Sequence, residues 1–220
     1  MRAFVVIVTL TAGACVETTP RWDLTHDRVI AVRASPPAIE AGGSAQLDAL
    51  VSAEGVARVI VPVEVTLSPD ALATVVQQDG AWVVIAGTSE MLAAAQARLP
   101  TGTSLRVDAE LVFDVAGIAK HATKSVRLSA TGENPVVSIR LADGQVATSI
   151  ETSVGVETQL STDAPDGASV DWLTSLGELT DDDDPVAFLT AEEAGAGSVV
   201  CVRRELGGGV GWAIAALAVE

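Results

Sequence analysis

The 220-residue sequence lacks tyrosine and has only three phenylalanines and two histidines. Aromatic residues make up 3% of the chain although 49% of it is hydrophobic, because most of the apolar side chains are alanine and valine. Cores filled by many small and β-branched side chains suit strands. The chain also lacks a G-x-S-x-G pattern, and its few histidines leave little for nucleophilic catalysis. We therefore expect a β-rich protein without enzymatic activity.

Cysteine is almost as scarce, since Cys15 and Cys201 are the only two. Cys201 lies in the apolar run 199–202, where a free cysteine is expected to behave as a small buried hydrophobe. Without a framework of paired cysteines, the fold does not depend on a disulfide, even in a compartment that permits one.

The first 15 residues have the features of an export signal. Arg2 gives a positive start, residues 4–10 form an apolar run, and the small residues 12–14 directly precede Cys15. The segment resembles the signal peptide of bacterial lipoproteins. The resemblance implies that residues 1–14 are removed and that Cys15 is lipidated as the first residue of the mature chain. Cleavage by a general signal peptidase and a buried strand are the alternatives.

The residue after Cys15 indicates where such a lipoprotein resides. In the lipoproteins that the segment resembles, an aspartate at this position retains the chain at the inner membrane, whereas this chain has Val16. The resemblance thus implies the outer membrane of a Gram-negative cell, on its periplasmic face or at the cell surface, with the N-terminal lipid as anchor. The apolar run is too short for a spanning helix, which needs about 20 residues.

Residues 15–27 show no hydrophobic period, and we expect them to form a lipidated tether. Twelve extended residues reach about 40 Å, and Trp22 is expected to be exposed there, at the lipid interface. Residues 131–135 combine glycine, asparagine and proline, which break any regular element. The remaining chain therefore divides into two domains, 28–131 and 132–220.

Both domains have the pattern of short strands separated by turns. The clearest strand is 104–113, in which apolar and charged residues alternate. Asp79 and Gly80 separate two apolar runs and form a strong hairpin signal. One helix is expected in the first domain, with Ser89 as its N-cap and Arg98 in its last turn, covering an edge of the first sandwich.

Some of these strands are similar to those of immunoglobulin-like modules. The prolines at 36–37 and the glycines at 42–43 resemble the first two strands of bacterial modules of this kind, and residues 170–172 resemble the strand that carries the core tryptophan. The resemblance implies an all-β fold of two tandem immunoglobulin-like β-sandwiches, with one short helix in the first. Because the inter-sheet disulfide of antibody domains is missing, it implies an architecture and no ligand.

The charge is distributed unevenly between the two domains. Residues 28–131 hold 8 Lys/Arg and 10 Asp/Glu, a balance of −2, whereas residues 133–220 hold 3 Lys/Arg and 16 Asp/Glu, a balance of −13. Such an acidic surface repels nucleic acid and anionic headgroups, which excludes both as partners of the second domain.

One acidic run has the chemistry of a hard-cation site. It consists of Asp181, Asp182, Asp183 and Asp184. Ca²⁺ takes six to eight oxygen ligands, which loops of sandwich domains can supply. The spacing differs from an EF-hand loop, and four contiguous like charges are also typical of a solvated loop. A Ca²⁺ site and a solvated loop are therefore the two interpretations.

The other polar motifs favour structural roles. His26 and His121 are expected at the surface, and the glycines 207–209 are expected to form a hairpin turn because the lysine of a phosphate loop is missing. Trp172 and Trp212 are expected in the core. The sequence predicts a structural, adhesive or protein-interaction module that contacts another protein or a surface polymer. A Ca²⁺- or glycan-binding recognition protein is the alternative.

Overall fold

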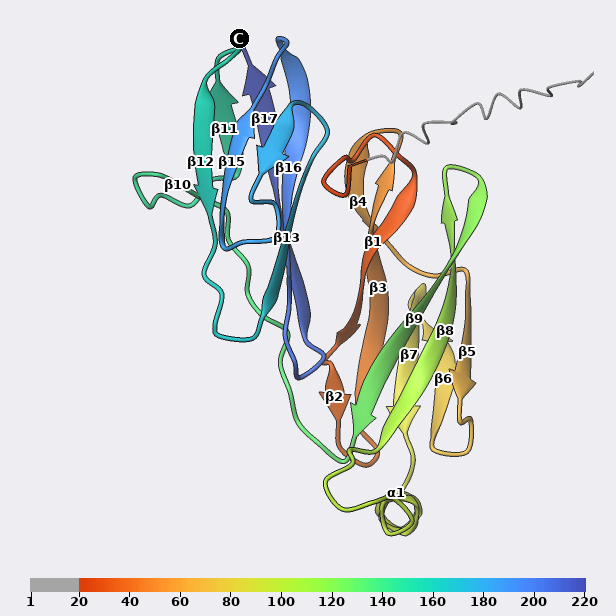
Figure 1. The fold of residues 1–220 in the computed structure, drawn as a ribbon. Helices are drawn as coiled ribbons and strands as arrows, with labels where there is room; N and C mark the ends of the chain where they lie inside the picture. The colour runs from red at the N-terminus through yellow and green to blue at the C-terminus, as the bar shows by residue number, and fades with distance from the viewer. Residues whose placement is uncertain (1–19) are drawn as a thin grey trace, which may run out of the picture.

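The structure is a computed structural model that describes residues 20–220. The expected signal peptide 1–14 and Cys15 lie outside the described residues. The described chain forms two β-sandwiches (Figure 1). The elements of the first are β1 Arg28–Ser35, β2 Ala38–Ile39, β3 Ser44–Ala53, β4 Val56–Ile60, β5 Glu64–Ser68, β6 Ala73–Gln78, β7 Ala81–Ala86, α1 Ser89–Gln96, β8 Arg106–Val115 and β9 Ile118–Leu128.

The second sandwich begins after an extended connection that contains the expected division at 131–132. Its elements are β10 Arg140–Leu141, β11 Ser149–Thr152, β12 Glu157–Ser161, β13 Ser169–Thr174, β14 Glu178–Thr180, β15 Val186–Thr190, β16 Gly195–Arg204 and β17 Val210–Val219.

The two sandwiches have the same strand order. The first consists of the sheets β1-β3-β7-β6, with β4 beside β3, and β2-β9-β8-β5. The second consists of β10-β12-β15-β14 and β11-β17-β16-β13. In each, a short strand near the start of the domain pairs in parallel with the last strand, as β2 does with β9 and β11 with β17. This is the immunoglobulin-like arrangement of strands, and the expected all-β fold with one short helix is confirmed.

Each sandwich has its own core between its two sheets. In the first, the alternation predicted for 104–113 is observed in β8, where Val107, Leu111 and Phe113 are buried. In the second, Trp172 on β13 is fully buried and donates hydrogen bonds from its backbone nitrogen to the Asp182 carbonyl at 2.8 Å and from its indole nitrogen to the Asp184 carbonyl at 2.9 Å. The position expected for the core tryptophan is thus correct.

The helix lies at one end of the first sandwich, between β7 and β8 (Figure 1). Its N-cap is Thr88, whose hydroxyl accepts a bond from the Met91 nitrogen, so the expected cap at Ser89 is wrong by one residue. The helix ends at Gln96, and Arg98 therefore lies beyond the last turn in which it was expected. Leu92 is its buried residue and joins the core of the first sandwich.

The sandwiches pack side by side, so that the outer face of one sheet lies against the outer face of another (Figure 1). The first sandwich contributes β1 and β3, and the second contributes β13, β16 and β17. A third apolar cluster fills the space between them. Its buried members are Leu24, Ala31, Leu50, Leu173, Val200, Val202 and Val210. Trp212 packs partly buried against this cluster, so it lies between the sandwiches and its expected place in a core is corrected.

Candidate functional site

The junction between the sandwiches begins with the segment just before β1. Leu24 is fully buried, and its backbone nitrogen donates to the Thr174 carbonyl at 2.9 Å, while the Thr174 nitrogen donates to the Trp22 carbonyl at 2.9 Å. The segment thus pairs with the free edge of β13. On the other side, the buried Ser52 hydroxyl of β3 donates to the Leu24 carbonyl. Residues 20–27 therefore join both sandwiches.

This placement differs from the tether that the sequence suggested for the same residues. Trp22 is half-buried against the second core, and Leu24 is fully buried in the apolar cluster at the junction. The exposure expected for Trp22 is therefore wrong. The tether expected over 15–27 is folded onto the protein from residue 20 onward.

The acidic run forms the loop between β14 and β15. The carbonyls of Asp182 and Asp184 hold Trp172, and the carboxylates of Asp182 and Asp183 lie 3.2 and 3.4 Å from the guanidinium of Arg21. Asp171 completes the set at 3.7 Å from Arg21. The Arg21 side chain is 58% exposed, so these pairs add little to stability.

The four aspartates of the acidic run lie at a tight turn. Within residues 20–220, no group of three or more histidine, cysteine or acidic side chains is placed to hold a metal ion. Asp181 has a positive φ of 57° at the turn, and the Asp184 nitrogen closes the turn on the Asp181 carbonyl at 3.1 Å. Calcium binding by Asp181, Asp182, Asp183 and Asp184 stays a prediction, for which calorimetric titration of the full chain with Ca²⁺ is the test.

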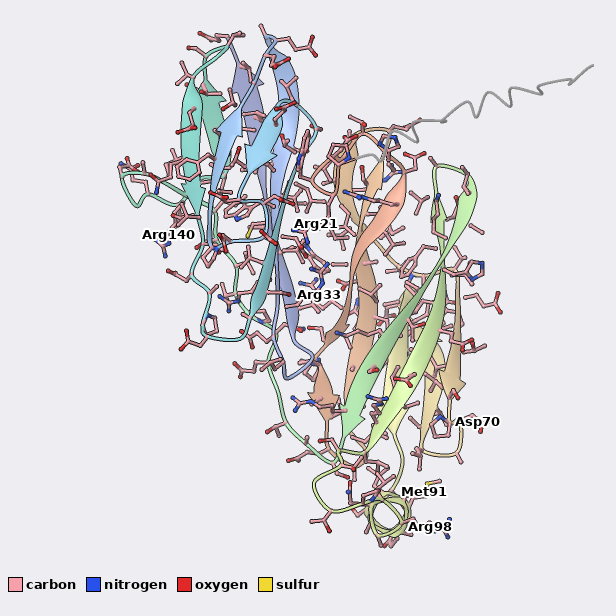
Figure 2. All side chains as sticks on the ribbon, in the orientation of Figure 1. Arg21, Arg33, Asp70, Met91, Arg98 and Arg140 are labelled. Atoms are coloured by element: carbon pink, nitrogen blue, oxygen red, sulfur yellow. The ribbon has the colours of Figure 1, made fainter. Side chains whose placement is uncertain are left out.

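Two arginines extend the junction beyond its apolar centre. Arg33 of β1 binds Asp48 through two hydrogen bonds of 3.0 and 2.6 Å and places its guanidinium carbon 4.0 Å from the centre of the Trp212 ring. Arg204 of β16 pairs with Asp171 and donates to the Ile30 carbonyl at 2.9 Å. Figure 2 shows Arg21 and Arg33 in the space between the sandwiches. Each guanidinium is thus oriented by a carboxylate while it contacts the other domain.

A lysine and an asparagine close the far end of the junction. The Lys124 amine of β9 donates to the Gly208 carbonyl of the β16–β17 hairpin at 2.6 Å. Burial and the nearby charge of Arg204 lower the pKa of Lys124 to about 8. Asn134, in the connection, donates to the Ala34 carbonyl at 2.8 Å and accepts from the Val210 nitrogen at 3.0 Å. The connection is therefore fixed to both domains.

The remaining candidates from the sequence do not meet in one site. Cys201 is buried on β16 opposite Trp172, and burial raises the pKa of its thiol to about 12. The glycines 207–209 lie at the β16–β17 hairpin, as expected. His26 is exposed and lies 3.0 Å from Asp23.

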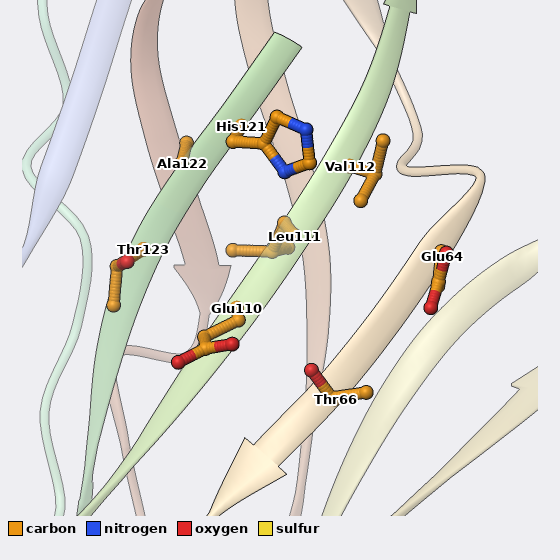
Figure 3. A pocket seen from close by; sticks show the side chains of 8 residues that line it. All are labelled: Glu64, Thr66, Glu110, Leu111, Val112, His121, Ala122 and Thr123. Atoms are coloured by element: carbon orange, nitrogen blue, oxygen red, sulfur yellow. The ribbon is translucent and has the colours of Figure 1, made fainter. Parts of the chain in front are cut away.

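His121 is exposed on the outer face of the sheet that holds β5, β8 and β9. It borders a shallow groove of about 400 Å³ beside Glu64 and Glu110 (Figure 3). Apart from its end at Arg127, which the β16–β17 hairpin approaches, this face is one of two sheet faces that the junction does not use. The other is the outer face of β10, β12, β15 and β14 in the second sandwich.

No helix within residues 20–220 is long and apolar enough to cross a membrane. No protein-family model matches the chain, and no curated protein matches it.

Solved structures of tandem modules are similar over most of the chain. The N-terminal Ig1-2 module of the Drosophila receptor protein tyrosine phosphatase DLAR has 12% identity and a TM-score of 0.34, and covers 88% of this chain and 98% of its own. The fibronectin(III)-like modules of Clostridium thermocellum CbhA have 13% identity and a TM-score of 0.31, with 86% and 94% covered. Domains 5-6 of the S-layer protein SbsC have 14% identity and a TM-score of 0.30, with 88% and 98% covered. The assignment of the fold rests on the strand order.

Proposed function

We propose that this protein is a non-enzymatic lipoprotein of the outer membrane whose paired sandwiches serve as a structural or protein-interaction module. The observation that carries the proposal is the side-by-side junction. It uses one outer sheet face of each sandwich and leaves open the face of β10-β12-β15-β14 and the part of the β5-β8-β9 face that the β16–β17 hairpin does not approach. A rigid body with two open faces suits a protein that holds or spaces a partner.

The membrane anchor is proposed from the pattern that precedes Cys15. Because the chain is packed against the second sandwich from Trp22 onward, a lipid on Cys15 would hold the folded body close to the bilayer. The seven residues from Cys15 to Arg21 extend to roughly 25 Å at most. This reach is clearly shorter than the roughly 45 Å that a free tether over 15–27 would give.

The chain offers a matched control for the anchor, because Cys201 is its other cysteine. Growth with a labelled fatty acid, followed by intact-mass measurement, is expected to show acyl chains on a chain that begins at Cys15. Cys15→Ala abolishes the label and Cys201→Ala leaves it. An unmodified chain that still begins at Met1 contradicts the anchor.

The interaction role is tested separately, by cross-linking after mild detergent extraction and mass spectrometry. Thr123→Arg alters the open face of β9, and Thr180→Arg alters the open face of the second sandwich. Arg58→Gln, on the exposed strand β4, is the control. We expect a partner that the native chain and the control both capture and that one open-face variant loses. A capture pattern unchanged by either face variant contradicts the role.

A further inference from the structure

A cavity of about 620 Å³ opens where the β16–β17 hairpin of the second sandwich approaches the outer face of the first. Its wall combines apolar side chains, two arginines and small polar groups. Both sandwiches contribute, since Leu206, Gly207 and Gly208 come from the hairpin and the rest from the first domain. The side chain of Leu206 is 92% exposed beside this cavity.

The two arginines stand side by side on neighbouring strands. Arg106 of β8 and Arg127 of β9 are direct partners in the antiparallel register. Like charges in directly opposed positions destabilise a sheet. Arg106 has a carboxylate of Asp108 at 4.0 Å, the outer limit of an ion pair. Arg127 forms no side-chain hydrogen bond or ion pair within residues 20–220, and its Nε atom is buried without a partner.

The surroundings of the arginine pair are unusual for this chain. The protein carries a net charge of −16, yet none of the residues that line the cavity is acidic. The Nε atom of Arg127 is closed off from solvent, as are those of Arg28, Arg140 and Arg203, so a ligand in the cavity would reach Arg127 through its terminal nitrogens. The guanidinium of Arg127 lies next to Gly132 of the connection and Gly207 of the β16–β17 hairpin. These two segments therefore pack around it.

We propose that this cavity binds a small amphiphilic oxyanion, with a carboxylate or phosphate group on Arg106 and Arg127 and an apolar body against the leucines. The planar guanidinium matches both oxyanions through paired hydrogen bonds. The apolar lining of Leu72, Leu99 and Leu206 suits an alkyl or aryl group. The proposal is independent of the lipid anchor, because every residue that it uses lies in the described sandwiches.

Calorimetric titration of the full folded chain tests this site with three probes that carry alkyl tails of nearly the same length. Octanoate and octyl phosphate carry the two oxyanions, and octanol carries none. We expect saturable binding of at least one anion, and the tighter of the two identifies the head group. Arg127→Gln and Arg106→Gln each weaken that binding at least about tenfold, which is 1.4 kcal/mol. Arg58→Gln leaves it unchanged.

Two further measurements separate a binding role from a structural one. Without ligand, Arg127→Gln is expected to keep or raise the melting temperature, because it removes the repulsion and the buried unpaired atom. Leu206→Ser, at an exposed position, is expected to weaken the binding of octanoate without altering the melting temperature of the ligand-free protein. The proposal is overturned by absence of saturable binding of both anions, by octanol binding as tightly as either, or by a lowered melting temperature of Arg127→Gln.

Discussion

Arg33 of the first sandwich lies over the ring of Trp212 in the second, with 4.0 Å between the guanidinium carbon and the ring centre. Asp48 fixes the guanidinium from its own sheet through two hydrogen bonds. A cation over an indole face contributes about 0.5–2 kcal/mol, more when it is desolvated. The pair therefore contributes to the stability of the junction.

A double-mutant cycle measures this contact directly. We expect Arg33→Met and Trp212→Leu each to lower the free energy of unfolding, and the double variant to lower it by less than the sum. The coupling should be of the order of 1 kcal/mol in chemical denaturation. Additive losses would show that the two side chains are neighbours without an energetic interaction.

Leu24 is the apolar residue through which the N-terminal segment joins the junction. Leu24→Ala is expected to cost about 2–5 kcal/mol of unfolding free energy, as large-to-small changes in packed cores do. Val136→Ala serves as control, because Val136 is 89% exposed. If residues 20–27 were a solvated tether, both changes would have the same small effect in denaturant titration.

At Gly211, the backbone of β17 lies directly against the backbone of the connection at Pro135. A Cβ atom there would overlap the carbonyl oxygen of Pro135, and backbone cannot turn aside as a side chain can. We expect Gly211→Ala to cost about 1–3 kcal/mol, the range for overpacking. Gly195→Ala, whose new methyl group would meet only the end of the Leu176 side chain at 3.3 Å, is the control. Equal melting temperatures for the two variants would contradict the close approach.

Lys124 makes the stability of the junction depend on pH. Its pKa is lowered to about 8 by burial and by Arg204, so the amine binds a proton less readily in the folded chain than in the unfolded one. Below about pH 8 both states are protonated and the cost of burying the charge is fully present. Between pH 8 and the ordinary lysine value near 10.4 the unfolded chain binds more protons, so this group makes folding more favourable as the pH rises.

Comparison with Lys124→Met isolates this effect from that of Cys201. The raised pKa of the Cys201 thiol acts in the opposite direction, because above about pH 8.5 the unfolded thiol loses its proton first. The unfolding free energy of native protein relative to Lys124→Met should therefore increase between about pH 8 and 10, by about 1.4 kcal/mol per unit of pKa shift. A difference that does not vary with pH would show that the amine keeps its ordinary pKa.

Local patterns in the sequence were sufficient to predict the elements of each sandwich. The alternation in 104–113 and the Asp79-Gly80 turn correspond to β8 and to the β6–β7 hairpin, because strand period and turn geometry are local properties. The helix cap was displaced by one residue, since Thr88 and Ser89 are both good caps and only the backbone geometry separates them.

The junction could not be predicted in the same way, because it brings together residues that are far apart in the chain. Arg204 reaches the Ile30 carbonyl across 174 positions. The run 199–202 contained one sequence signal for the junction. Its four successive apolar residues break the apolar–polar alternation that is typical of a strand with one solvent-exposed face. Such runs indicate a strand that is covered on both sides. In β16, Val199 and Cys201 belong to the core of the second sandwich, and Val200 and Val202 belong to the apolar cluster at the junction.

Together, the contacts of this junction make the two sandwiches one rigid body. Scanning calorimetry of the full chain tests it most directly, because separate domains of this size would each unfold as a unit of their own. We expect one transition whose calorimetric and van't Hoff enthalpies agree. Two resolved transitions, or a calorimetric enthalpy near twice the van't Hoff value, would contradict the claim.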